Sequence, residues 1–200
     1  MSTSATATTR SARAAAFAKR ERLIDAAGQL FHQQGVERTT LAHIAGLADV
    51  PLGNVYYYFR TKDDIVNAVV SARLAAQDAL FTAIEQAHRS PAIRLKAFFN
   101  ELAGQAELVS RYGCPYGSLA TELQNGGHGA DRDIANLIQT SIDWAHRQFQ
   151  QMGRGNPRAL AIQFIAAYHG AAVLTHALHS PDLMNREARR VGRWIDSLRE

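Results

Sequence analysis

The sequence predicts an all-α protein, and three observations carry that prediction. Alanine is abundant and runs of β-branched residues are short, so strand signals are scarce. Glycine and proline fall mainly between long segments with helical periodicity. Hydrophobic residues make up 46% of the 200 residues, which is enough for a substantial core. We therefore expect about nine helices, arranged as a small N-terminal domain joined to a larger helical body.

The excess positive charge lies at the N-terminal end of the chain. Residues 1–62 hold eight Lys/Arg and four Asp/Glu, while the rest of the chain holds fourteen of each, so the net charge of +4 sits in the first segment. This asymmetry is typical of a nucleic-acid-binding end on a neutral body. The single cysteine excludes an internal disulfide framework, and the eight histidines form no metal-binding motif. We expect no metal and no cofactor.

Targeting and membrane signals are weak. No apolar signal segment opens the chain. The most apolar window, Ala159–Leu178, has about the length of a membrane span. It contains Gln163, His169, Thr175 and His176, which indicate a buried helix instead. We therefore expect a cytoplasmic protein without a membrane partner.

A flexible basic tail, residues 1–12, is expected before the first helix. Residues 1–9 are rich in Ser, Thr and Ala, and the basic residues begin at Arg10. Apolar residues at helical spacing predict a helix from Arg13 to Gln34, which Gly35 ends. The basic side chains here either contact DNA phosphates or the minor groove, or form an ordinary solvated surface.

Residues 39–62 are the stretch around which the rest of the chain is organised. One face of Thr40–Ala48 is apolar at helical spacing, and Thr39 or Thr40 can supply the oxygen that caps this helix. Pro51 cannot continue that helix but suits the first position of another. Two short helices across a tight turn form a helix-turn-helix, whose second helix can enter the DNA major groove.

The second helix of this pair carries unusual chemistry. It is expected from about Leu52 to Phe59, with Val55 and Phe59 buried, and it holds three consecutive tyrosines at 56–58. Adjacent positions point in different directions around a helix, so the three tyrosines cannot all be core. A tyrosine on the groove side offers a hydroxyl to a phosphate and a ring edge to a base. The alternative is that one tyrosine packs inward and the others simply lie at the surface.

A longer pattern runs in order through about residues 22–66. It consists of Phe31-x-x-x-Gly35, Thr39-Thr40, Ile44-Ala45 and Gly53-x-Val55-Tyr56-x-Tyr58-Phe59-x-x-Lys62. This pattern resembles the N-terminal DNA-binding domain of the TetR family of transcriptional regulators. The family usually has glycine in the turn, where this chain has Asp49, a residue that tolerates left-handed backbone. Leu52 stands where the family often has a polar or basic residue.

The resemblance and the chemistry of the second helix together imply the DNA-contacting residues. These are Thr39, Thr40, Pro51, Leu52, Gly53, Asn54, Tyr56, Tyr57, Arg60 and Lys62.

The remaining helices follow from their start and stop signals. Thr61 and Asp64 form a capping box that opens a helix to about His88, and its first turn is expected to face a DNA phosphate. The further helices are expected over 91–112, 118–124, 131–152, 157–178 and from 181 to the C-terminus. The chain thus divides into a tail (1–12), a DNA-binding domain (13–66) and a ligand-binding and dimerisation domain (67–200).

The last two helices are expected to form a dimer surface. Residues 157–178 are rich in alanine and glycine, which let another helix approach closely. The resemblance implies that these two helices pair with their symmetry mates as a four-helix bundle. Because a single recognition helix reads few base pairs, a two-fold dimer on a palindrome is the usual solution. The alternative is ordinary packing within one chain.

The segment Gly113–Leu123 resembles part of a TetR subgroup, in which Gly-Cys-x-x-Gly precedes a Leu-x-x-Glu-Leu helix and borders the ligand cavity. Cys114 follows a helix C-terminus, whose dipole is expected to raise the thiol pKa. Cys114 is either a packed residue at a helix junction or a thiol that senses oxidants or electrophiles. An apolar or aromatic small-molecule effector is expected to contact Phe98, Leu102, Cys114, Tyr116, Leu119, Trp144, Tyr168 and His169.

The function that these observations favour is a homodimeric transcriptional regulator, most often a repressor in this family, which binds double-stranded operator DNA and responds to a ligand. One alternative is an architectural DNA-binding protein without an effector. Another is a helical hydrolase using Ser118 or Cys114, although the sequence has no nucleophile-elbow or phosphate-loop motif.

Overall fold

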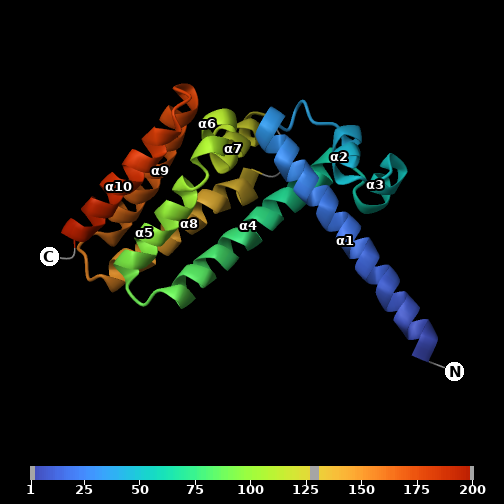
Figure 1. Ribbon diagram of the computed structural model, residues 1–200, viewed down its shortest axis with the longest axis horizontal. Coiled ribbons are helices and arrows are strands. Elements are labelled where there is room, and N and C mark those ends of the chain that lie inside the picture. The colour runs from blue at the N-terminus through green and yellow to red at the C-terminus, as the bar shows by residue number, and fades with distance from the viewer. Residues whose placement is uncertain (1–2, 127–130, 199–200) are drawn as a thin grey trace.

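The computed structural model describes residues 3–126 and 131–198, and every regular element in these ranges is a helix (Figure 1). The all-α prediction is confirmed. In chain order the helices are α1 (Thr3–Gln34), α2 (Leu41–Ala48), α3 (Leu52–Tyr58), α4 (Lys62–Ala87), α5 (Pro91–Ala103), α6 (Ala106–Tyr112), α7 (Pro115–Gly126), α8 (Asp131–Gln151), α9 (Pro157–Ala177) and α10 (Pro181–Ser197).

Three helix boundaries differ from those expected from the sequence. The helix expected over 118–124 begins earlier, because Pro115 suits the first turn of a helix and α7 runs from Pro115 to Gly126. The helix expected over 91–112 is divided into α5 and α6 at Gly104, a residue with low helix propensity. The helix α1 begins at Thr3, so residues 3–12 continue it instead of forming a flexible tail. Alanine is frequent here and neither glycine nor proline occurs before Gly28, so nothing in the local sequence ends the helix.

Helices α1, α2 and α3 and the start of α4 lie at one end of the molecule, and the sequence signals that set their boundaries are local (Figure 1). Gly35 adopts a positive φ of 87° and ends α1. Asp49 adopts the left-handed conformation between α2 and α3, as its side chain permits. Thr40 caps α2 by accepting from the His43 N–H, and a second capping box, expected from the sequence, opens α4.

The capping box of α4 joins Thr61 and Asp64. The Thr61 hydroxyl accepts from the Asp64 N–H, and the Asp64 carboxylate accepts from the backbone N–H groups of Thr61 and Arg60, each at 2.9 Å. These bonds favour the charged carboxylate, so the pKa of Asp64 is lowered, mainly by the Thr61 N–H. The start of α4 is therefore fixed directly after α3.

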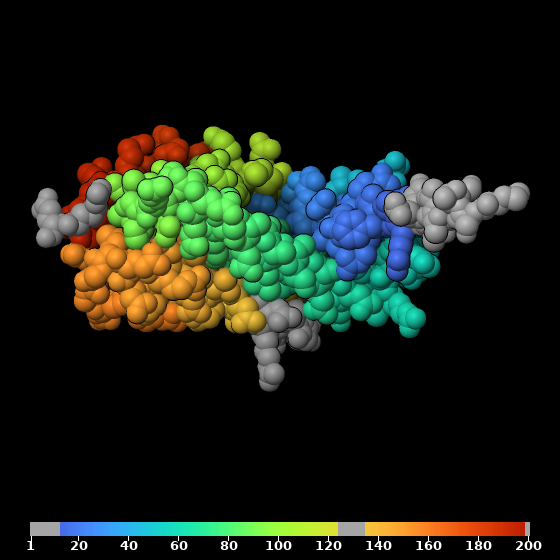
Figure 2. Space-filling model, turned by 90° about the horizontal axis from the view of Figure 1, so that it is seen from below, coloured from blue at the N-terminus to red at the C-terminus, as the bar shows by residue number. Residues whose placement is uncertain are grey.

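Two hydrophobic clusters stabilise the fold, and α4 belongs to both. The first cluster packs α1, α2 and α3 against Ile65, Val66, Val69 and Val70 of α4, and includes residues of α7. The second packs the other end of α4 against α5, α6, α8, α9 and α10. Tyr116 of α7 contacts both clusters. Figure 2 shows α4 running from the blue end of the molecule, formed by α1, to the orange helices of the body.

Among the described residues, α9 alone is long and apolar enough to cross a membrane, and core helices of soluble proteins meet the same test. In this fold α9 packs on α8 and α10, and its buried side chains belong to the second cluster. Its remaining apolar residues lie on the outer surface of the body.

Candidate nucleic-acid interface and effector cavity

Helix α3 is held by two buried anchors and presents the rest of its surface outward. Val55 and Phe59 are buried, as expected from their spacing. Tyr57 is 82% exposed and Tyr56 is 55% exposed. Tyr58 is half-buried, and its ring meets the ring of Tyr57 edge-on at 5.0 Å. One tyrosine therefore packs inward while two remain available to a partner.

Most of the residues expected to contact DNA lie on this outward surface. The exposed ones are Thr40, Pro51, Leu52, Gly53, Asn54, Tyr56, Tyr57 and Arg60. Lys62 is half-buried, and its Nζ donates to the carbonyl of Glu37 at 3.0 Å.

Thr39 does not lie on that surface. Its side chain is buried, donates to the Gly35 carbonyl at 2.7 Å and accepts from the Gln34 amide at 3.2 Å. Because Thr40 takes the capping position of α2, Thr39 faces inward and holds the junction between α1 and α2. We therefore remove Thr39 from the expected DNA contacts.

Arginines of α1 lie against the helix-turn-helix. The Arg22 guanidinium donates to the carbonyl of Asp49 in the turn at 3.4 Å. The Arg20 guanidinium lies 5.3 Å from the ring centroid of Phe59, close enough for a cation–π interaction. These contacts place positive charge from α1 beside the turn before α3 and the residue that ends α3.

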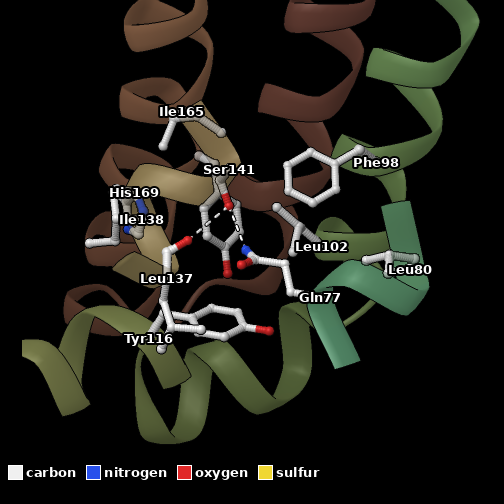
Figure 3. Close-up of a pocket in the computed structure, with 11 residues that line it drawn as sticks. Gln77, Leu80, Phe98, Leu102, Tyr116, Leu137, Ile138, Ser141, Ile165 and His169 are labelled. Carbon is white, nitrogen blue, oxygen red and sulfur yellow. Dashed lines mark hydrogen bonds between the residues drawn. The ribbon is translucent and has the colours of Figure 1, made fainter. Parts of the chain in front are cut away.

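A small cavity lies inside the body between α4, α5, α7, α8 and α9 (Figure 3). It measures about 20 Å³, room for about one water molecule. A drug-sized ligand needs a pocket of about 300 Å³ or more. Ligand binding therefore requires the surrounding helices to move apart. The residues that line the cavity are Gln77, Leu80, Phe98, Leu102, Tyr116, Leu137, Ile138, Ser141, Ile165, Tyr168 and His169.

Five of the eight residues expected to contact an effector line this cavity: Phe98, Leu102, Tyr116, Tyr168 and His169. The other three lie elsewhere. Leu119 is buried in the first cluster, because α7 packs its apolar side on the DNA-binding end. Trp144 is fully buried beside the cavity, with its ring stacked on Phe81 at 4.7 Å and its indole N–H donating to the Glu85 carboxylate at 2.9 Å.

Cys114 lies outside the cavity, at a surface groove between α7 and α9. Its Sγ lies 3.6 Å from the Tyr168 hydroxyl and 3.9 Å from the His169 Nδ1, and it accepts from the Gly117 N–H at 3.4 Å. Burial raises the thiol pKa, but the bonds to His169 and Gly117 outweigh it, so the pKa of Cys114 lies below its usual value. The expected rise was wrong because the fold places His169 beside the sulfur, and because α7 starts immediately after Cys114 and presents an N–H to it.

Sequence reasoning missed the polar pair in the cavity wall, Gln77 and Ser141. The Gln77 amide donates to the Ser141 hydroxyl at 2.6 Å, and this hydroxyl lies 3.3 Å from the Leu137 carbonyl. The available signal was the position of Gln77 on α4. It lies four residues before Phe81, within the series of apolar residues that faces the core.

Three contacts connect the cavity region to the DNA-binding end. The His32 ring donates to the Gly113 carbonyl at 2.8 Å, and the Glu122 carboxylate accepts from the Glu37 N–H at 2.8 Å. Arg73 donates to the Gly28 carbonyl at 3.2 Å and lies 5.7 Å from the ring centroid of Tyr116. Since Tyr116 lines the cavity, Arg73 connects the cavity wall to α1 through these two contacts.

The outer surface formed by α9 and α10 is apolar along α9 and charged along α10. Val173 and Leu174 are 66% and 53% exposed. A groove beside them runs between the small residues of α9 and a series of charged residues on α10. Its lining residues are Ala166, Ala167, Gly170, Ala171, Leu174, Leu183, Arg186, Glu187, Arg190 and Arg193.

Comparison with known proteins agrees with this geometry. The family described as bacterial regulatory proteins, tetR family, matches residues 23–69. The chain is 27% identical over 188 residues to the HTH-type transcriptional regulator TtgR of Pseudomonas putida, covering 89% of this chain and 88% of that one. It is 34% identical over 83 residues to the HTH-type transcriptional repressor BepR of Brucella suis, covering 41% and 40%. Among solved structures, the TetR-family regulator SCO4454 from Streptomyces coelicolor has a TM-score of 0.79 at 20% identity, covering 92% and 97%.

Proposed function

Because this chain belongs to the TetR family of DNA-binding transcriptional regulators, we propose that it represses transcription by binding a palindromic operator as a homodimer. An apolar or aromatic small molecule releases it from the operator. The protein acts in the cytoplasm, where it meets DNA. One relative that matches part of the chain is named a repressor, which favours repression over activation.

The observation that carries this proposal is the double role of α4. Val66 and Val69 of α4 are buried in the cluster that supports the helix-turn-helix. Gln77 and Leu80 of the same helix line the cavity. A ligand that pushes α4 outward therefore also shifts the support of the recognition helix.

DNA recognition follows from the exposed surface of α3. Arginine and lysine side chains give salt-dependent affinity for phosphates, while Asn54, Tyr56 and Tyr57 are the side chains with groups for base edges. A dimer presents two such helices to successive major grooves. The exposed apolar residues of α9 and the groove beside α10 supply a surface for this dimer.

Release follows from the small volume of the cavity. An effector cannot occupy about 20 Å³, so it binds only a form in which the cavity helices have separated. Binding shifts the population toward this form, in which the two recognition helices no longer match the operator spacing.

The test is fluorescence anisotropy of the purified protein on labelled DNA from beside its own gene, with random DNA as competitor. We expect binding that survives the competitor and weakens steeply as salt increases. Binding that random DNA abolishes would favour an architectural DNA-binding protein. If a folded dimer bound no DNA at any salt concentration, the proposal would be overturned.

A further inference from the structure

We propose that the effector is an uncharged aromatic molecule that donates a hydrogen bond to the Oε1 atom of Gln77. This inference rests on the proposed function, because it concerns the chemistry of the effector cavity. It is carried by one buried oxygen atom without a partner and by the lack of fixed charge around it.

The hydrogen-bond network determines which atom of the Gln77 amide is free. The Ser141 hydroxyl donates to the Leu137 carbonyl at 3.3 Å, as serines on helices often do to the carbonyl four residues earlier. With its proton placed there, the hydroxyl accepts from the Nε2 of Gln77 at 2.6 Å. Figure 3 shows this chain of two bonds.

The Oε1 of Gln77 is left without a hydrogen-bond partner among the described residues, although only 5% of the residue is exposed. A carbonyl oxygen that stays buried without a donor when a ligand is bound weakens binding. A ligand that supplies an N–H or O–H satisfies this oxygen, whereas a purely apolar ligand leaves it unpaired. The site therefore selects for a donor, as polar sites do when an incorrect ligand leaves them unpaired.

The other lining residues determine the rest of the ligand. Phe98, Tyr116 and Tyr168 contribute aromatic rings, and the aliphatic side chains of α5, α8 and α9 fill the wall between them. None of the described lining residues is an Asp, Glu, Lys or Arg, and His169 is the one imidazole among them.

Two charged residues near the cavity do not line it. Arg73 lines a separate surface groove between α1 and α4, donates to Gly28 and contacts the ring of Tyr116, while its Nε has no partner among the described residues. Glu85 accepts from Trp144 and Gln148. An ionised ligand would lose its hydration without gaining a counter-ion, so a neutral ligand is favoured.

The test uses matched pairs of neutral probes that differ only in their hydrogen-bond donor: phenol with anisole, and naphthol with methoxynaphthalene. Isothermal titration calorimetry measures the affinity of each probe for the wild-type protein. We expect the hydroxyl member of a pair to bind about tenfold more tightly than its methyl ether.

Three variants connect this preference to the Gln77 oxygen. Gln77→Met is expected to reduce the preference to within about twofold while ether binding is retained. Ser141→Ala removes the hydroxyl that holds the Gln77 amide, so either Oε1 or Nε2 can face the ligand and the preference for the hydroxyl probe should also fall. This variant replaces Gln77→Met if that protein does not fold. Gln148→Met is the matched control, because Gln148 is an equally buried glutamine that does not line the cavity. It should keep the tenfold preference.

Equal affinity within the pairs, tighter binding of the ethers, or no binding of any probe to the wild type would overturn the inference. So would a preference that survives in both Gln77→Met and Ser141→Ala. Operator binding, measured on the same preparations, separates the two proposals. If the protein binds its operator specifically but the probes give one of these contradicting results, only the proposed ligand class is wrong. If operator binding itself is absent, the proposed function fails.

Discussion

The carboxylate of Glu122 accepts a hydrogen bond from the backbone N–H of Glu37 at 2.8 Å, and this contact joins α7 to the segment between α1 and α2. The same carboxylate lies beside Gly35, where an added Cβ would come within 3.0 Å of it. The body of the protein is thus attached to the DNA-binding end at the point where α1 stops.

We expect Glu122→Ala to lower the free energy of unfolding by about 1–2 kcal/mol, because it removes a charged acceptor from a backbone donor. Chemical denaturation at a fixed protein concentration measures this loss. Glu122→Gln is the control, since its amide oxygen can still accept from Glu37, and its loss should be clearly smaller. Equal unfolding midpoints for the wild type and Glu122→Ala would show that the contact is unimportant.

Much of the DNA-binding end follows from local sequence signals. The turn at Asp49, the stop at Gly35 and the capping box of Thr61 and Asp64 each depend on residues close together in the chain. The sequence could not decide between Thr39 and Thr40 as the cap of α2. That choice depends on the buried bonds of Thr39 to Gly35 and Gln34.

The cavity could be predicted only in part. Its aromatic residues Phe98, Tyr116 and Tyr168 were expected because the resemblance places their helices around the ligand cavity, and Trp144, chosen on the same ground, lies outside it. Gln77 and Ser141 were missed because they lie on α4 and α8, 64 residues apart, and nothing in the sequence pairs them. The thiol environment of Cys114 likewise depends on Tyr168 and His169 of α9, more than fifty residues away.

Stability is expected to fall in mild acid through His32. Burial lowers the pKa of His32 below the usual 6.5, and the positive charge of Arg73 adds to this effect, while the bond to Gly113 opposes it. The unfolded chain therefore binds a proton at a pH where the folded protein does not. The His32 contribution to stability is complete above about pH 6.5 and is lost as the pH falls toward the lowered value.

The measurement compares the urea midpoints at about pH 7.5 and about pH 5.5 for the wild type and His32→Gln. Glutamine retains a donor for the Gly113 carbonyl but does not titrate. The wild type should lose more stability between the two pH values than His32→Gln does. Identical losses would show that His32 is not the source of the acid sensitivity.

Trp144 is expected to act through packing rather than through ligand contact. Trp144→Ala removes a fully buried ring that stacks on Phe81, which should cost about 3–5 kcal/mol. Trp144→Phe keeps most of the packing but leaves the Glu85 carboxylate without the indole donor, so a smaller loss is expected. In thermal unfolding the two variants should follow this order, while Trp144→Phe keeps the probe preference of the wild type. A changed preference for the hydroxyl probe would indicate that Trp144 contacts the ligand.

Tyr57 is expected to contribute directly to operator affinity. Its side chain is 82% exposed, so its substitution should leave the fold intact. Tyr57→Phe removes one hydroxyl donor and should weaken specific binding about threefold to tenfold, and Tyr57→Ala should weaken it further. Anisotropy titrations on the operator measure both losses. Tyr112→Phe, on α6 of the body, is the matched control and should bind as the wild type does.

Leu174 is expected to lie in the dimer interface. Its side chain is 53% exposed on α9 and lines the groove that also holds Arg186, Arg190 and Arg193 of α10. Leu174→Arg adds a fourth positive charge to this groove and removes apolar surface from it, so the dimer should dissociate. Sedimentation or light scattering should then give the mass of a monomer.

A monomer presents one recognition helix instead of two, so operator affinity should fall by orders of magnitude even though α3 is unchanged. Phe17→Glu is the control for the mass measurement, because Phe17 is also an exposed apolar residue but lies on α1, away from α9 and α10 (Figure 1). It should remain dimeric. If the Leu174→Arg protein stayed dimeric, the dimer interface would have to lie on another surface. One that became monomeric yet bound the operator with wild-type affinity would mean that repression does not need the dimer.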